Sequence, residues 1–196
     1  MNAEIDVTNV VLRTERLTLR PWRQDDLDDL FEYASVDGVG SMAGWEAHAD
    51  KWVSQTILNS FIEGKKTFAL EYHGKVIGSL GIEKYPEDRF PEFAEKRCRE
   101  IGFVLGKPYW GQGLMPEAVM EADRWLFEEV GLDVIFCGHF LRNGRSARAQ
   151  EKCGFRHYAY GKYETQMGTV EDDEVNILTR EDWKKSASPE TGKEQQ

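Results

Sequence analysis

A β-strand that runs directly into a glycine turn and then into a helix is the most constraining feature of this chain. Residues 100–115 read EIGFVLGKPYWGQGLM, and an amphipathic helical pattern follows at once. A helix N-terminus leaves several backbone N–H groups without intrahelical partners, next to the positive end of the helix dipole. Glycines in the turn let the backbone approach a ligand closely. The segment therefore predicts a binding place for a phosphate or diphosphate, with a plain strand-to-helix turn as the alternative.

Two common phosphate-binding motifs do not fit this turn. No Gly-Lys-Ser/Thr follows Trp110-Gly111-Gln112-Gly113 at the spacing of a Walker loop. The dinucleotide motif G-x-G-x-x-G is also absent, because Pro116 stands three positions after Gly113. A phosphoryl-transfer enzyme would further need its particular lysine and acidic metal ligands, and the sequence does not show that set.

Length and charge narrow the classes of protein further. With 196 residues, 40% of them hydrophobic, the chain has the size and the apolar content of one packed domain. The formal net charge is −10, and the resulting field repels nucleic acid and anionic membranes and attracts cationic amines. We expect one domain over residues 1–183, a polar and disordered tail over 184–196, and neither nucleic acid nor membrane as a partner.

The cysteine pattern and the N-terminus bear on the compartment. Cys98, Cys137 and Cys153 are odd in number and lack the spacing of a metal site. We see no secretory hydrophobic region and no apolar run of membrane-span length. We therefore expect reduced thiols in a cytoplasmic protein and no metal. Cys137 and His139 share one face of an apolar strand, where an inert thiol is favoured over a nucleophile.

Hydrophobic periodicity and turn residues predict strands and helices in a mixed order. Antiparallel hairpins precede a strand–helix–strand centre, which describes an α+β (mixed α/β) domain with helices covering the sheet. The expected strands cover residues 11–19, 67–72, 76–82, 98–105, 134–141, 155–163 and 171–178, and the expected helices cover residues 24–34, 47–63, 115–130 and about 143–154.

Four segments, taken in this order and spacing, resemble the GNAT superfamily of acetyl-CoA-dependent N-acetyltransferases. They look closest to its ribosomal-protein-acetyltransferase (RimJ/RimL-like) branch, over roughly Leu12 to Asp182. The resemblance implies a central, mostly antiparallel, splayed sheet of about seven strands flanked by about four helices. The segments are LRTERLTLRP (12–21), EIGFVL (100–105), WGQGLMPEA (110–118) and NGRSARAQEKCGF (143–155).

The resemblance makes acetyl-CoA the co-substrate and the glycine turn its diphosphate loop. The family's loop pattern is Gln/Arg-x-x-Gly-x-Gly/Ala, and Trp110, Gly113 and Met115 take the three defined positions. Met115 departs from this pattern, so its side chain must point away from the cofactor or narrow the site. The backbone N–H groups expected to hold the diphosphate belong to Gly111, Gln112, Gly113, Leu114 and Met115. Lys107 and Arg148 either attract phosphate or are ordinary surface residues.

The strand before the loop carries two further expectations. By resemblance, the backbone of Phe103, Val104 and Leu105 pairs with the pantetheine arm like an added strand, and the Val104 N–H polarises the acetyl oxygen. An alkylammonium has a pKa of about 10, so acetyl transfer near neutral pH requires a base. A carboxylate at the position of Glu100 serves as general base in several relatives. An exposed or substrate-orienting glutamate is the alternative for Glu100.

Asn143 and Ser146 match the branch's N-x-x-S motif. The resemblance implies that Asn143 binds the pantetheine arm and that Ser146 donates a proton or hydrogen bond to the leaving sulfur. Either residue can instead cap the following helix. Tyr158, Tyr160 and Tyr163 are alternative acids, although packing or substrate contact is the simpler expectation for them.

The acceptor is expected to be a primary amine, either a small molecule or a protein N-terminus. In relatives its site is formed by the loop between the first two helices and by the hairpin connections, here residues 37–52 and 85–97, together with the last strand pair. Aromatic and acidic side chains there suit a cationic amine, and a solvated surface is the alternative. These side chains are Trp45, Glu46, Trp52, Tyr85, Glu87, Asp88 and Glu92.

A catalytically silent CoA-binding sensor or partner-binding module of the same fold is the alternative function. The presence of Glu100, Asn143 and Ser146 together argues against it. The resemblance also allows a homodimer.

Overall fold

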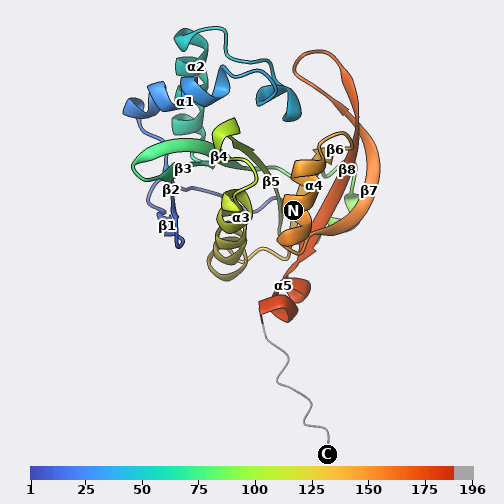
Figure 1. The fold of residues 1–196 in the computed structure, drawn as a ribbon. Coiled ribbons are helices and arrows are strands. Elements are labelled where there is room, and N and C mark those ends of the chain that lie inside the picture. The colour runs from blue at the N-terminus through green and yellow to red at the C-terminus, as the bar shows by residue number, and fades with distance from the viewer. Residues whose placement is uncertain (188–196) are drawn as a thin grey trace, which may run out of the picture.

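An eight-stranded sheet forms the centre of the computed structural model, which describes residues 1–187 (Figure 1). The strands lie in the order β1-β2-β3-β4-β5-β6-β8-β7. Every neighbouring pair is antiparallel except β5 and β6, which are parallel. The strands are β1 (Leu12–Arg13), β2 (Leu17–Pro21), β3 (Thr67–Tyr72), β4 (Lys75–Glu83), β5 (Cys98–Leu105), β6 (Val134–Phe140), β7 (Arg156–Glu164) and β8 (Val170–Thr179).

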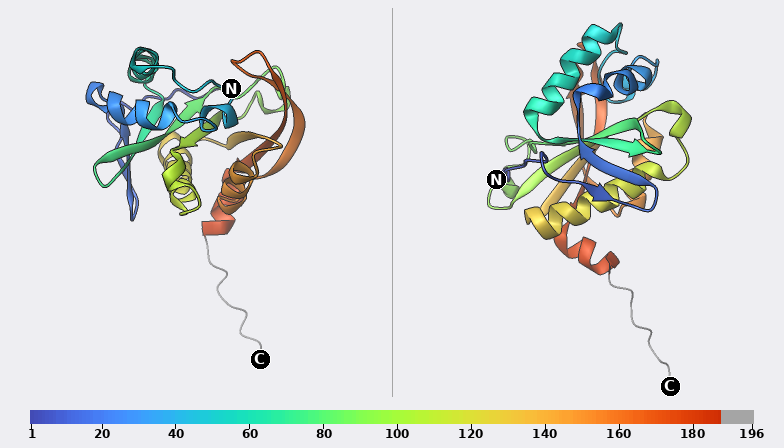
Figure 2. Two further views of the ribbon diagram at one scale, coloured as in Figure 1. Left: turned by 45° about the horizontal axis from the view of Figure 1, so that its top comes forward. Right: turned by 90° about the vertical axis from the view of Figure 1, so that its left-hand side faces the viewer.

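Helices cover both faces of this sheet (Figure 2). The first two helices pack on one face, and the third and fourth pack on the other. The prediction of a mixed α/β fold with a mostly antiparallel sheet is confirmed, with one strand and one helix more than expected among the described residues. The helices are α1 (Leu27–Ala34), α2 (Lys51–Gly64), α3 (Leu114–Trp125), α4 (Gly144–Lys152) and α5 (Arg180–Ala187).

The first predicted strand is in fact a short hairpin, β1–β2. Its turn is closed by Thr14, whose N–H donates to the Leu17 carbonyl oxygen at 2.9 Å. Glu117 of α3 holds the turn from outside, because it accepts from the Thr14 hydroxyl and from the Arg16 N–H. The partner that shapes this turn lies a hundred residues away, so the local sequence does not reveal it.

Two helix boundaries also differ from the prediction. Helix α2 begins at Lys51 rather than near 47, because the Asp50 side chain caps it by accepting from the N–H groups of Trp52 and Val53. The expected helix 115–130 is α3 followed by one π-helical turn over residues 126–130, which Gly131 ends at φ 81°.

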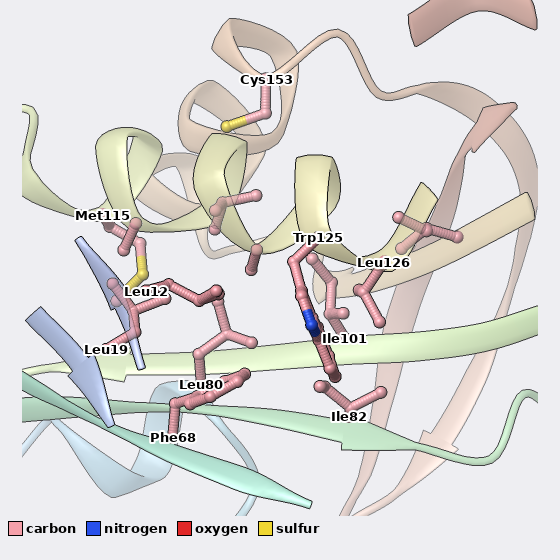
Figure 3. Close-up of a cluster of buried hydrophobic side chains, with 14 of the residues drawn as sticks. Leu12, Leu19, Phe68, Leu80, Ile82, Ile101, Met115, Trp125, Leu126 and Cys153 are labelled. Atoms are coloured by element: carbon pink, nitrogen blue, oxygen red, sulfur yellow. The ribbon is translucent and has the colours of Figure 1, made fainter. Parts of the chain in front are cut away.

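Helix α3 is fixed to the sheet by a large apolar core (Figure 3). Trp125 meets Phe68 of β3 edge to face, with ring centroids 5.7 Å apart. Met115 and Leu126 lie on the same face of the helix and point to the sheet. This packing holds the helix N-terminus in place beside the end of β5. Residues drawn from the sheet side are Leu12, Leu19, Phe68, Leu80, Ile82 and Ile101.

The predicted disordered tail is partly wrong. Residues 184–187 belong to α5, and residues 188–196 lie outside the described part of the chain. None of the helices within residues 1–187 is both long and apolar enough to cross a membrane.

Candidate active site

Strands β5 and β6 diverge within the sheet, as expected for a splayed sheet. They pair only at three positions, from Cys98 opposite Val134 to Glu100 opposite Phe136. Beyond Glu100 the edge of β5 is open, and a cleft of about 640 Å³ lies there. The cleft brings together ten of the eleven site residues predicted from the sequence, namely Glu100, Phe103, Val104, Leu105, Gly111, Gly113, Leu114, Met115, Asn143 and Ser146. Gln112 does not line it.

The glycine loop presents free backbone donors to the cleft. Gly111 and Gly113 have φ values of 76° and 77°, the left-handed region that favours glycine. Gly113 is the N-cap of α3 and supplies no side chain to cap it. Within residues 1–187, the backbone N–H groups of residues 111–115 have no hydrogen-bond acceptor. Five unpartnered donors at a helix N-terminus fit a diphosphate.

Met115 and Gln112 direct their side chains away from the free amides. Met115 is 6% exposed and packs beside Leu12 in the core (Figure 3). The departure from the family's small residue is therefore compatible with the loop, because the larger side chain fills the interior. Gln112 folds back onto the loop, where its Nε2 donates to the Pro108 carbonyl oxygen at 2.8 Å.

Helix α4 adds positive charge to this end of the cleft. Its cleft-lining cations are Arg145, Arg148 and Lys152. Arg145 also lies over the Trp110 ring, with Cζ 4.3 Å from the centroid. Of these three residues, only Arg148 is among those considered from the sequence. Their i, i+3, i+7 spacing on one helix face was the available signal. These cations offset the net negative charge of the chain where an anion would bind.

The register of β5 changes the expectation for Val104. The Ile82 N–H of β4 donates to the Lys66 carbonyl oxygen beside β3 at 2.9 Å, so Ile82 opposite Ile101 is a non-hydrogen-bonded pair of the β4–β5 ladder. Hydrogen-bonded and non-hydrogen-bonded pairs alternate along an antiparallel ladder. Val104 opposite Ser79 is then hydrogen-bonded to β4, so its N–H points away from the open edge. The backbone groups that face the edge are those of Phe103 and Leu105.

The Glu100 carboxylate is shielded at the end of the paired segment. It lies over Gly138 of β6, where an added Cβ would be 3.4 Å from Glu100 Oε1. Within the described chain it accepts no hydrogen bond. Burial raises the pKa of Glu100 to about 7, while the Arg89 charge opposes the rise and the Asp173 and Glu83 charges add to it. A carboxylate with this pKa can accept a proton near neutral pH.

Asn143 and Ser146 sit at the N-terminus of α4, and the helix-capping interpretation of Asn143 is confirmed. Its Oδ1 accepts from the Ser146 N–H at 3.2 Å, and its Nδ2 donates to the Met42 carbonyl oxygen at 3.2 Å. The Ser146 hydroxyl accepts from Nε2 of buried Gln150 at 3.1 Å. Gln150 leaves the hydroxyl hydrogen free to donate, which orients Ser146 as a donor.

Among the three tyrosines considered as acids, only Tyr163 lines the cleft. Tyr158 donates to Glu92, and Tyr160 is 66% exposed. Cys137 also lines the cleft, but burial raises its thiol pKa well above the ordinary value. A protonated thiol is a poor nucleophile.

The acceptor side of the cleft differs from the prediction in its acidic groups. Of the seven aromatic and acidic residues expected there, only Trp45 is a lining residue. Tyr85 is buried in the core, and Trp52 is 76% exposed on α2. The carboxylates that line the cleft beside Glu100 are Glu83 and Asp173. Both come from strands, and only the sheet register brings them to this place.

Comparison with known proteins shows the family of the chain. The family model of the acetyltransferase (GNAT) domain matches residues 16–156. The chain therefore belongs to the GNAT acetyltransferases and is an N-acetyltransferase by class. The branch within the family stays a prediction.

Individual relatives are distant. The FsC-acetyl coenzyme A-N(2)-transacetylase of Aspergillus fumigatus is 29% identical over 119 residues, which are 59% of this chain and only 51% of that longer protein. The uncharacterized N-acetyltransferase YoaA of Bacillus subtilis is 28% identical over 178 residues, covering 87% of this chain and 97% of YoaA. A GNAT-family acetyltransferase structure from Bacillus anthracis superposes with a TM-score of 0.76 at 23% identity, covering 88% of this chain and 99% of that one.

Proposed function

We propose that the protein transfers an acetyl group from acetyl-CoA to a primary amine, either a small molecule or a protein N-terminus, by direct transfer in a ternary complex. One observation carries the proposal. The open edge of β5 connects five unpartnered amides at residues 111–115 with the shielded Glu100 carboxylate in a single cleft. An anion-binding end and an acid–base end joined by a free strand edge are what such a transfer requires.

The binding roles follow from the same geometry. The amides of residues 111–115 would hold the diphosphate of acetyl-CoA. Arg145, Arg148 and Lys152 would supply positive charge for the other phosphate group of the coenzyme. The backbone of Phe103 and Leu105 would pair with the pantetheine arm, and one of their N–H groups would polarise the acetyl oxygen. When bound, the thioester supplies the acetyl group.

The chemical roles fall to three side chains. Glu100, directly or through a water, takes the proton of the amine as the new amide bond forms. Ser146, oriented by Gln150, donates a hydrogen bond to the departing sulfur. Asn143 fixes the N-terminus of α4 and thereby the position of Ser146.

An acceptor screen monitored by release of free CoA thiol tests this proposal. The panel should contain small primary amines and peptides with free N-termini, and thermal stabilisation by acetyl-CoA should be measured in parallel. We expect stabilisation together with turnover on at least one acceptor. Stabilisation without any turnover would favour a CoA-binding sensor, and stabilisation by ATP–Mg instead of acetyl-CoA would overturn the assignment.

The ribosomal-protein branch and a cytoplasmic location are part of the proposal. Support for the branch comes from the N-x-x-S motif at Asn143 and Ser146. Support for the compartment comes from the three cysteines, which are all free and buried.

A further inference from the structure

An arginine from outside the cleft reaches across the edge strand β7 at Gly161. Arg89 lies in the connection between β4 and β5. A Cβ added to Gly161 would be 2.1 Å from Arg89 Nη2 and 2.8 Å from its Cζ. The φ of Gly161 is not in the left-handed region, so backbone conformation does not require glycine. The missing side chain instead makes room for the guanidinium.

The guanidinium is fixed by its contacts on the cleft side. Arg89 Nη1 is 2.9 Å from Asp173 Oδ2, and Nη2 is 3.3 Å from Oδ1, a two-point pair. Asp173 is 4% exposed and stands opposite Gly161 in the β7–β8 register. The Phe90 ring lies under the guanidinium, 5.0 Å from Cζ to centroid. The pair therefore ties the β4–β5 connection to β8.

Asp173, the carboxylate of this pair, lines the acceptor side of the cleft together with Glu100. Asp173 and Glu83 line this space from β8 and β4, and Cys137 lies beside it on β6. Burial keeps the Cys137 thiol protonated by raising its pKa. Glu83 stands opposite Glu100 in the ladder. Several charged groups in the described part of the chain shift the pKa of Glu100. Arg89 is the one cation among them.

We propose that the Arg89–Asp173 pair, admitted by the missing side chain of Gly161, is a positioning element that places a fixed positive charge beside Glu100. The proposal rests on the proposed function, because it assigns a purpose to the ionised form of Glu100. Without Arg89, the carboxylates of Asp173 and Glu83 and the buried environment would favour the protonated form of Glu100, which cannot accept the proton of the amine. Arg89 touches no reacting atom and acts through Glu100.

The dependence of kcat/KM on pH tests this role. In the parent we expect kcat/KM to fall at low pH as Glu100 becomes protonated, which gives the pH profile an acid limb. Arg89→Gln should move that limb to higher pH by about one unit, which lowers kcat/KM at pH 6 about tenfold and leaves the plateau much less affected. Gly161→Ala should produce the same shift, because the new methyl group displaces the guanidinium. Arg89→Lys keeps a charge but not the two-point pair, so we expect an intermediate position.

Two matched substitutions serve as controls. Gly64→Ala adds a methyl group where the nearest heavy atom outside the helix backbone is 3.7 Å away. Arg156→Gln removes an arginine that pairs with Asp182. In both variants the acid limb of kcat/KM should lie at the same pH as in the parent. If Arg89→Gln and Gly161→Ala lower the rate equally at every pH with an unshifted limb, the pair is only structural and the proposal is overturned.

A direct titration decides the proposal independently of activity. Carboxyl carbon NMR of protein labelled at glutamate gives the Glu100 midpoint, with Glu100→Gln assigning the signal. The midpoint should rise in Arg89→Gln and in Gly161→Ala, and an unchanged midpoint would contradict the proposal. If the parent releases no thiol with any acceptor, the proposed function fails, whereas the titration still reports on the pair.

Discussion

The indole N–H of Trp110 donates to the carbonyl oxygen of Leu105 at 2.6 Å, and this bond ties the glycine loop to the last residue of β5. The guanidinium of Arg145 from helix α4 lies over the same ring. One aromatic side chain thus sets the relative position of the loop, the open strand edge and the basic helix. Trp110 stands where the family pattern has Gln or Arg.

Replacement of Trp110 by Phe should weaken CoA binding without unfolding the protein. The substitution keeps an aromatic ring for Arg145 but removes the donor to Leu105. A hydrogen bond of this kind contributes about 1 kcal/mol, so calorimetric titration should show CoA affinity falling roughly fivefold. Trp52→Phe, on an exposed ring of α2, should leave the affinity unchanged. If Trp110→Phe and the parent bind CoA with equal affinity, the hydrogen bond from Trp110 to Leu105 does not contribute to the function of the loop.

The rate of acetyl transfer should rise with pH through neutrality. Glu100 must be ionised to accept a proton, and its pKa is raised to about 7 by burial. The parent's kcat/KM should therefore increase from about pH 6 and level off near pH 8. Glu100→Gln should remove this limb and lower the plateau, with CoA affinity nearly intact. A limb that persists unchanged in Glu100→Gln would assign it to another group.

Asn143 should show a capping effect and a binding effect that can be separated. Asn143→Ala removes the acceptor for the Ser146 N–H, so thermal unfolding should report a loss of about 1 kcal/mol. Asn143→Ser keeps a capping oxygen and should recover most of that stability. Because we propose that the amide also contacts the pantetheine arm, the CoA affinity of Asn143→Ser should stay low. Full recovery of both properties would reduce Asn143 to a cap.

The buried carboxyl of Asp123 should make the free energy of unfolding decrease as the pH rises. Its carboxyl is buried in α3, both oxygens lack a hydrogen-bond partner in the described structure, and burial raises its pKa well above 3.8. The unfolded chain ionises this group at its ordinary pKa while the folded chain keeps it protonated, so folding loses stability as pH rises above that value. Urea unfolding should show Asp123→Asn gaining stability over the parent at pH 8 and little at pH 4. Exposed Asp88→Asn is the control, and an equal gain at both pH values would contradict the account.

The glycine loop and the strand before it were predictable because their signals are local. A strand, two glycines and a helical pattern follow one another within residues 100–115, and each has a direct backbone consequence. Glu100 begins this segment, Asn143 and Ser146 lie at the N-terminus of α4, and the resemblance placed all three in one cleft. The orientation of Val104 was not predictable, because it depends on the β4–β5 register.

Features formed by residues far apart in the chain could not be predicted from the sequence. The β1–β2 turn depends on Glu117 of α3, and the acidic side of the cleft depends on Asp173, which is brought in by the pairing of β8 with β6. The close approach of the Arg89 guanidinium to Gly161 is also formed by residues far apart in the sequence. Each is a long-range contact, and periodicity carries no information about such contacts.

A crystal structure of the complex with acetyl-CoA tests the central claim most directly. The account predicts diphosphate oxygens within about 3.2 Å of the backbone nitrogens of residues 111–115, with the pantetheine arm along the Phe103–Leu105 edge of β5. A complex in which those amides face solvent while the coenzyme lies elsewhere would contradict it.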